Sequence, residues 1–415
     1  MRHHFSRRPR ENAWNDDWLP LAADVEAYTR RGLLTDLSNA LVPHHEWLLD
    51  PDLSFLNHGS YGAVPRTVLD QQRRLQERME RDPTKFLALE LPQALRTSAN
   101  RLATFVKGDG SDLAFIENAT AGCNMVLGSF RLSPGDEILL TDHGYPAIRK
   151  AAEHYTTRGG AIITEVTVPF PIRDPSEIIN AVANRLGPRT RLVILDHVSS
   201  PTAIVFPVRE LAALCHEAGA KVMIDGAHAP GMLSLDIPAI GVDWYVGNCH
   251  KWLMAPKGSG FLWASPASQA ETRPLVISHG YRQGFAAEFD WIGTRDPTAW
   301  LSISAAIDYH FCIGGQLLCE RNTRLARQAA NLLAKHWNSE RGSDDALTGS
   351  MSTVRLPLVG EATDERALEL RYILRKDHHI DAAVIAFKGS LWIRLSAQAY
   401  NYFSEYERLA DAFPR

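Results

Sequence analysis

The chain has 415 residues, more than one compact core usually holds, so we expect two closely packed domains. A hydrophobic content of 45% and a charged content of 22% are typical of a soluble globular protein, and the net charge of -4 argues against nucleic-acid binding. There is no apolar run of about 18 residues that would predict a membrane span. The five scattered cysteines lack metal-ligand or disulfide spacing, so we expect a cytoplasmic protein without a bound metal.

The chain starts with the arginine-rich segment Met1–Arg10 and continues into the polar stretch Glu11–Asp17. The pair Arg7 and Arg8 superficially resembles a twin-arginine signal, but the apolar region that such a signal requires does not follow. We expect a disordered basic tail. Residues 1–50 are predicted to be this tail and a helical segment that packs with a small C-terminal domain.

Two amphipathic helices are predicted next, at about Pro65–Arg81 and Leu91–Lys107. Short apolar runs then alternate with helical patterns, which favours βαβ units and a mostly parallel sheet covered by helices on both faces. The predicted strands are Leu113–Ile116, Glu137–Leu140, Ala161–Thr167, Leu192–Leu195, Val222–Asp225, Trp244–Gly247 and Gly260–Trp263. The predicted helices between them start near Thr120, after Pro146, at Pro175 and at Val208.

The last third of the chain has a different pattern. Helices are predicted at Ala299–His310 and Gly315–His336, followed by strands at Thr353–Leu358 and Leu391–Leu395. This mixture is typical of a small α+β domain. We therefore predict a large α/β domain over residues 51–298 and a small one over residues 299–415.

Two strand ends deliver an unusual pair of charged residues. Asp225 ends the run Val222–Asp225, and Lys251 follows the run Trp244–Asn248 after a polar turn. Because α/β sheets bind ligands outside the carboxyl ends of their strands, both side chains should face one crevice. Pyridoxal 5'-phosphate requires this arrangement: a lysine that forms a Schiff base and a carboxylate that keeps the pyridine nitrogen protonated. Each residue alone could have an ordinary structural role, the aspartate as a buried strand-end residue and the lysine as a solvated surface residue. Such roles do not explain why the two occur together.

A phosphate cradle is predicted where Ala119 and Thr120 open a helix, because backbone N–H groups and a hydroxyl meet there. An ordinary helix cap has the same pattern. Asn248 and His250, just before the lysine, can also donate to phosphate oxygens. Thr294, in a polar turn, is either a further phosphate contact or a loop residue.

Three more residues are candidates for the site. Tyr145 follows a strand end and can stack on the cofactor, or it is a surface tyrosine. His228 lies three residues after the aspartate and can reach the ring hydroxyl, although a lone histidine is more often structural. Arg394 stands in an apolar strand, where an unpaired charge is costly. A substrate carboxylate gripped by the guanidinium would explain it, as would an internal ion pair.

Together these motifs resemble the class V pyridoxal-phosphate-dependent aminotransferases, and most of all their isopenicillin N epimerase branch. The resemblance is carried by Asp225–Gly231, His250–Leu253, Gly293–Asp296, Leu56–Gly62 and Ile393–Ser396, and extends from about residue 45 to the end. It implies an α/β protein of pyridoxal-phosphate fold type I, with a mostly parallel sheet sandwiched by helices in a large domain and a small α+β domain.

The resemblance also implies roles for single residues. Lys251 would be the Schiff-base lysine and Asp225 the partner of the pyridinium. His228 would contact the ring oxygen, and Tyr145 would stack where many relatives have a histidine. The residues that would hold phosphate are Ala119, Thr120, Asn248 and His250, with Thr294 of the neighbouring subunit of a homodimer. Arg394, with Asn57 of the early motif, would bind the substrate carboxylate.

We expect an enzyme that transforms an amino acid through a carbanion at its α-carbon, with Lys251 as base. The first interpretation is an epimerase of an amino-acid-derived natural product. It requires either reprotonation from the opposite face, for which Tyr145 is the candidate, or a single base that swings between the two faces. A β-eliminating carbon–sulfur lyase acting on a cysteine S-conjugate and an aminotransferase remain alternatives.

Two other classes fit the sequence less well. A cysteine desulfurase needs a nucleophilic cysteine, and none lies between Glu320 and Arg394. A non-catalytic cofactor-binding module of a transcription regulator would need a DNA-binding domain. The roughly 45 residues before the core are too few for one.

Overall fold

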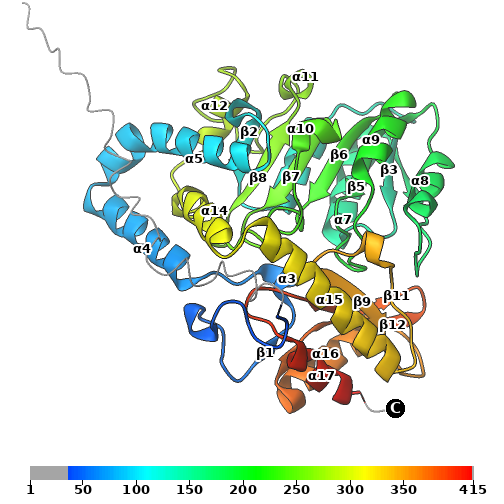
Figure 1. The fold of residues 1–415 in the computed structure, drawn as a ribbon. Coiled ribbons are helices and arrows are strands. Elements are labelled where there is room, and N and C mark those ends of the chain that lie inside the picture. Colours follow the sequence, from blue (N-terminus) through cyan, green and yellow to red (C-terminus); the bar gives the residue numbers. More distant parts are fainter. Residues whose placement is uncertain (1–35, 414–415) are drawn as a thin grey trace, which may run out of the picture.

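A computed structural model describes residues 36–413, so the predicted basic tail Met1–Arg10 lies outside the described residues. A seven-stranded sheet with the order β2-β8-β7-β6-β5-β3-β4 forms the upper half of the molecule in Figure 1. The sheet is parallel except for β8, which runs antiparallel to both of its neighbours. Its strands are β2 Leu113–Ile116, β3 Glu137–Thr141, β4 Ile162–Val166, β5 Thr190–Asp196, β6 Lys221–Gly226, β7 Trp244–Asn248 and β8 Gly260–Ala264.

Helices cover both faces of this sheet, and successive side chains of each strand enter opposite cores. Val222 and Ile224 of β6 pack in the core that contains α8 and α9, whereas Met223 packs in the core that contains α6 and α7. The alternation explains why the strands are apolar throughout. The helices between the strands are α6 Ala119–Ser129, α7 Pro146–Gly159, α8 Pro175–Ala183, α9 Val208–Glu217, α10 Ile237–Ile240, α11 Pro266–Gln269 and α12 Phe285–Asp290.

The helices that precede and follow the sheet pack together. The helix predicted at Ala299–His310 is two helices, because Ser302 interrupts it and its hydroxyl donates to the Thr298 carbonyl at 2.7 Å. No helix within residues 36–413 is both long and apolar enough to cross a membrane. These outer elements are η1 His44–Glu46, α3 His58–Tyr61, α4 Arg66–Arg81, η2 Lys85–Glu90, α5 Leu91–Phe105, η3 Gly110–Asp112, α13 Thr298–Leu301 and α14 Ile303–Cys312.

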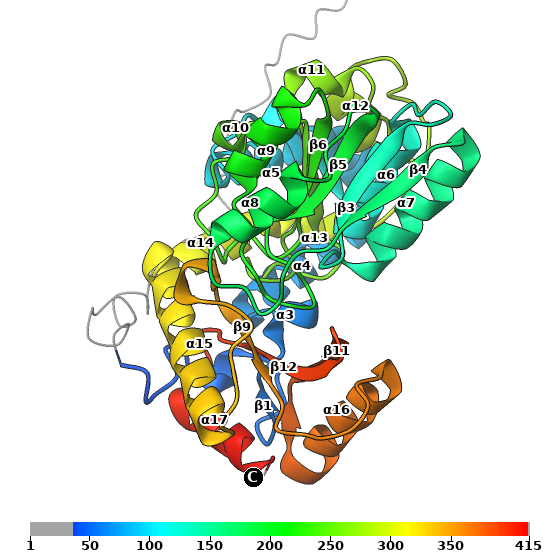
Figure 2. The same ribbon diagram turned by 90° about the vertical axis from the view of Figure 1, so that its right-hand side faces the viewer.

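A second, smaller unit lies below the large sheet in Figures 1 and 2 and has a core of its own. Its antiparallel sheet has the order β11-β12-β9, and β1 pairs with β10 in parallel. Along α15, Leu318 packs in the first core and Leu325 packs in the second, while the domain division at residue 298 stays a prediction. The elements are β1 Ser54–Phe55, α15 Gln316–His336, η4 Asp345–Leu347, β9 Met351–Arg355, α16 Asp364–His378, β10 Ile380–Asp381, β11 Ala383–Phe387, β12 Ser390–Ser396 and α17 Phe403–Asp411.

The segments that follow β6 and β7 touch each other at Gly231. The φ of this glycine is +83°, and a Cβ atom there would lie 2.5 Å from the backbone of Trp252 and Leu253. Only glycine permits both the left-handed backbone and this close approach. The contact fixes the segment carrying Asp225 and His228 against the segment carrying Lys251.

We expect Gly231→Ala to lower the free energy of unfolding by about 2–5 kcal/mol, from backbone strain and overpacking together. Gly219 is a matched control, since its φ is +81° but a Cβ atom there would meet nothing within 4 Å. Gly219→Ala should therefore cost about 1–2 kcal/mol, from strain alone. Denaturant unfolding measures both values, and equal losses would refute the close packing at Gly231.

Candidate functional site

Lys251 is held in the turn after β7 by a buried histidine of α3. His58 Nε2 lies 3.0 Å from the Lys251 carbonyl oxygen, which can only accept, so the nitrogen donates. His58 Nδ1 lies 2.8 Å from the Tyr400 hydroxyl. The backbone of the lysine is thus fixed from the small-domain side while its amine is free to point into the site.

The Lys251 amine is buried, and burial lowers its pKa to about 8, although Asp225 favours the charged form. Its Nζ lies 3.3 Å from His228 Nε2. The Trp252 indole donates to His228 Nδ1 at 3.4 Å, and burial keeps the pKa of His228 well below its usual value. A neutral His228 therefore carries its proton on Nε2 and can donate it to an unprotonated amine. The environment therefore raises the fraction of neutral, nucleophilic lysine near neutral pH.

Asp225 has a second carboxyl group beside it, which the sequence pattern did not indicate. Asp196 of β5 is its register partner on the neighbouring strand. Both residues follow strand positions that pack toward α6 and α7, and both line a cavity of about 260 Å³ together with Tyr145. Asp196 directly follows the apolar run Leu192–Leu195, just as Asp225 ends the run Val222–Asp225. This position is the signal in the sequence that could have revealed Asp196.

Burial dominates the charge states of the two carboxyl groups. It raises the pKa of Asp225, whose Oδ1 accepts the Ala227 N–H at 3.0 Å. Burial and then the negative charge of Asp225 raise the pKa of Asp196 well above its usual value. Two neighbouring buried carboxyl groups do not readily ionise together. We expect a protonated Asp196 that leaves a single negative charge at Asp225 for a ring nitrogen.

The predicted phosphate residues gather at the amino end of α6 but are not equivalent. Asn248 Oδ1 accepts the Ala119 N–H at 2.8 Å and so holds the start of the helix. Within the described chain, the N–H and hydroxyl of Thr120 have no hydrogen-bond partner, so both can donate to an anion. His250 Nδ1 donates to the Ser259 carbonyl at 3.2 Å, and burial lowers the His250 pKa to about 4. A bound dianion would favour protonation of its other nitrogen.

Arg394 is buried without a counterion. Its guanidinium donates to the Ser200 carbonyl at 2.5 Å, to Ser60 Oγ at 3.0 Å and to Asn57 Oδ1 at 3.4 Å. No carboxylate among residues 36–413 forms an ion pair with it, so an internal ion pair does not explain Arg394, and its Nε has no partner. Burial lowers its pKa to about 10. A buried, preorganised and uncompensated guanidinium suits a substrate carboxylate.

Tyr145 and Thr294 lie at the border of the site. Tyr145 precedes α7, and 43% of its surface is exposed. Thr294 is exposed, and no hydrogen bond joins it to Lys251 within the described chain. The next residue, Arg295, pairs with Glu117 at 2.5 Å, just before the amino end of α6. The role of Thr294 in a partner subunit stays a prediction.

The model of the family Aminotransferase class-V matches residues 62–409. The chain belongs to the class-V aminotransferase family. It is 35% identical to isopenicillin N epimerase of Streptomyces clavuligerus over 383 residues, which cover 88% of this chain and 95% of the relative. It is 34% identical to putative L-cysteine desulfhydrase 1 of Oryza sativa subsp. japonica over 408 residues, which cover 89% and 83%. The solved complex of the cystine C–S lyase C-DES with cysteine persulfide has a TM-score of 0.74 at 23% identity, covering 88% and 99%.

These matches confirm the predicted family, the fold type I architecture and an enzyme that uses pyridoxal phosphate, the cofactor of class-V enzymes. The described residues fit that cofactor. A buried amine whose pKa is lowered lies near a buried carboxylate, and Thr120 offers free donors at the start of a helix. The roles of the individual residues remain predictions.

We expect Lys251→Met to abolish both turnover and the visible absorbance of lysine-bound cofactor, because the substitution removes the amine and keeps the apolar stem. Lys257→Met is the matched control. Lys257 Nζ donates to the Gly62 carbonyl at 3.0 Å and is not aimed at Asp225. The control should retain the absorbance band. A lysine-linked band in the Lys251 variant would contradict the assignment.

The carboxyl pair makes the apoprotein sensitive to pH. A carboxyl group whose folded pKa is raised stays protonated while the unfolded group, with a pKa of about 3.9, has ionised, so stability falls as pH rises between the two values by up to about 1.4 kcal/mol per pH unit. Asp196→Asn removes one such group. We expect its melting temperature to exceed that of wild type by more at pH 8 than at pH 5. The exposed Asp52→Asn is the control, and equal shifts at both pH values would rule out a protonated Asp196.

Proposed function

We propose that the protein is a pyridoxal-phosphate-dependent carbon–sulfur lyase that cleaves the bond between the β-carbon and sulfur of cysteine or a cysteine S-conjugate. The observation that carries the proposal is the buried amine of Lys251, which interacts with Asp225 and whose pKa is lowered to about 8. A β-elimination needs one base at the α-carbon, whereas epimerisation by two bases needs a second acid on the opposite face.

The residues of this chain can divide the work of such a reaction. Arg394 binds the substrate carboxylate and, with Asn57 and Ser60 fixing the guanidinium, orients the α-carbon. When bound, the cofactor draws electrons from that carbon, and Asp225 sustains this by holding the ring nitrogen protonated. Lys251 takes the α-proton and can return it to the departing sulfur. With one water molecule, cysteine then gives sulfide, pyruvate and ammonia.

The cysteines of this chain support release of the sulfur as a free product. Cys249 lies near the lysine but is buried, and burial raises its pKa well above the usual value. Burial also raises the pKa of Cys123 beneath Asp225. Protonated, inaccessible thiols are poor nucleophiles. A persulfide on the protein, as in a desulfurase, is therefore not part of the proposal.

The relatives support this choice without fixing the substrate. Putative L-cysteine desulfhydrase 1 has a name that describes removal of sulfur from cysteine, and its similarity extends over 89% of this chain. The similarity to isopenicillin N epimerase is equally extensive. Conserved architecture alone therefore does not separate the two reactions, and the difference must come from the acid–base groups.

Epimerisation is the second candidate, and Tyr145 is the observation that favours it. Tyr145 lines the same cavity as Asp225, and its hydroxyl is the candidate for protonating the face opposite Lys251. Within residues 36–413, however, this hydroxyl has no hydrogen-bond partner that would activate it. A tyrosine without such a partner is a weak acid catalyst at neutral pH.

The test is product analysis in heavy water with L-cysteine, L-cystine, S-conjugates and a panel of other amino acids. We expect sulfide from cysteine, a thiol from an S-conjugate or cysteine persulfide from cystine, each with equal amounts of pyruvate and ammonia. Turnover of Tyr145→Phe should stay within about fivefold of wild type, because the ring is retained and a general acid would contribute more. Recovered amino acid with deuterium at an inverted α-carbon, lost in Tyr145→Phe, would replace the lyase with an epimerase.

A further inference from the structure

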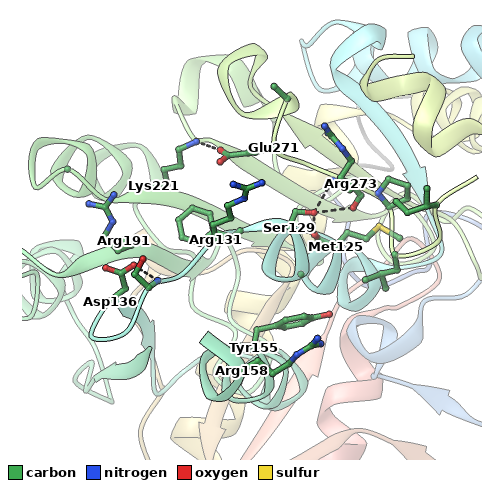
Figure 3. A pocket seen from close by; sticks show the side chains of 18 residues that line it. Met125, Ser129, Arg131, Asp136, Tyr155, Arg158, Arg191, Lys221, Glu271 and Arg273 are labelled. Carbon is green, nitrogen blue, oxygen red and sulfur yellow. Dashed lines mark hydrogen bonds and ion pairs between the residues drawn. The ribbon is translucent and has the colours of Figure 1, made fainter. Parts of the chain in front are cut away.

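A second cavity, of about 1000 Å³, lies at the amino-terminal edge of the large sheet (Figure 3). Arg191 is near the start of β5 and Lys221 starts β6, whereas Asp196 and Asp225 lie at the other ends of these strands. Since a strand rises about 3.3 Å per residue, roughly 16 Å of β5 separate Arg191 from Asp196. This cavity is therefore separate from the site around Lys251.

The cavity wall carries more positive than negative charge. Five cationic side chains line it, against the carboxylates of Asp136 and Glu271. The cationic residues are Arg131, Arg158, Arg191, Lys221 and Arg273. Glu271 pairs with Lys221, and Arg273 is paired with Glu288 at 3.3 Å outside the lining.

Three of the arginines are left without a counterion. Arg131 follows α6, Arg158 lies at the end of α7 and Arg191 belongs to β5, and none forms an ion pair with a residue of the described chain. A single exposed arginine is ordinarily solvated and needs no ligand. Here three separate segments place exposed arginines on one concave surface, where a bound anion would offset their like charges.

We propose that this cavity binds a small anion that carries two or more phosphate groups. Guanidinium groups match phosphate oxygens with paired hydrogen bonds, and three of them can neutralise a diphosphate. The volume exceeds what a single phosphate fills. Tyr155, Phe130 and Met125 add an aromatic and apolar wall, so an organic diphosphate such as a nucleotide suits the cavity better than an inorganic one.

Calorimetric titration of the cofactor-loaded protein with ADP and with pyrophosphate tests the proposal, because loading fills the phosphate site at α6. We expect both to bind, ADP more tightly, with affinities that fall as salt is added. Replacing the three unpaired arginines by glutamine should weaken binding at least about a hundredfold, since each lost charge-assisted contact costs about tenfold. The variant is Arg131→Gln, Arg158→Gln and Arg191→Gln.

A matched control removes the same charge elsewhere on the surface. Its three substitutions, at exposed arginines that do not line the cavity, should leave the affinity within about twofold, because distant charges are screened by salt. They are Arg81→Gln, Arg185→Gln and Arg209→Gln. Circular dichroism checks that both variants are folded. Absence of binding by wild type, or equal losses in the two variants, would overturn the proposal.

Discussion

Burial of ionisable groups at the carboxyl edge of the large sheet is the constraint on which the site depends. Asp225, Asp196 and Arg394 are buried and the amine of the half-buried Lys251 is enclosed, and in such surroundings a charge is stabilised only by a partner. The lysine responds by becoming a neutral nucleophile near pH 8. The arginine cannot lose its proton at that pH, so it remains a cation that lacks an anion. The folded chain thus contains buried charges that a protonated cofactor ring and a substrate carboxylate can balance.

The fold positions these groups by two geometric rules. Parallel strands end at the same edge, which brings Asp196 and Asp225 together as register partners. Alternation along each strand then places both carboxyl groups on the face covered by α6 and α7, where the free donors of Thr120 lie. The contact of Gly231 with the backbone after Lys251 sets the distance between the two catalytic segments. A small shift in this packing would therefore change the position of Lys251 relative to Asp225.

The sequence predicted the parts of the molecule that a strong pattern specifies. Most strands of the large sheet are buried apolar runs, and helix α9 begins at the predicted residue Val208. The helix α16 and the short strand β10 were not predicted, because α16 buries few side chains and β10 has two residues. Asp196 was missed for a different reason: the apolar run was taken to end at Leu195, one residue before its functional end. The predicted role of Thr294 involves a second chain, and a single chain does not test it.

Elimination and epimerisation differ in the acid–base groups that they need on the two sides of the α-carbon. The residues that both reactions share do not decide between them. Lysine, aspartate and arginine serve any reaction that begins with loss of the α-proton. In this chain the lysine side is enclosed, with Trp252 setting the tautomer of His228 beside the amine. Tyr145, the residue predicted for the opposite side, is exposed and has no activating partner in the described chain. On the lysine side, the protein can therefore transfer protons. The predicted role of Tyr145 on the other side is reduced to stacking on the cofactor. That imbalance favours elimination over inversion.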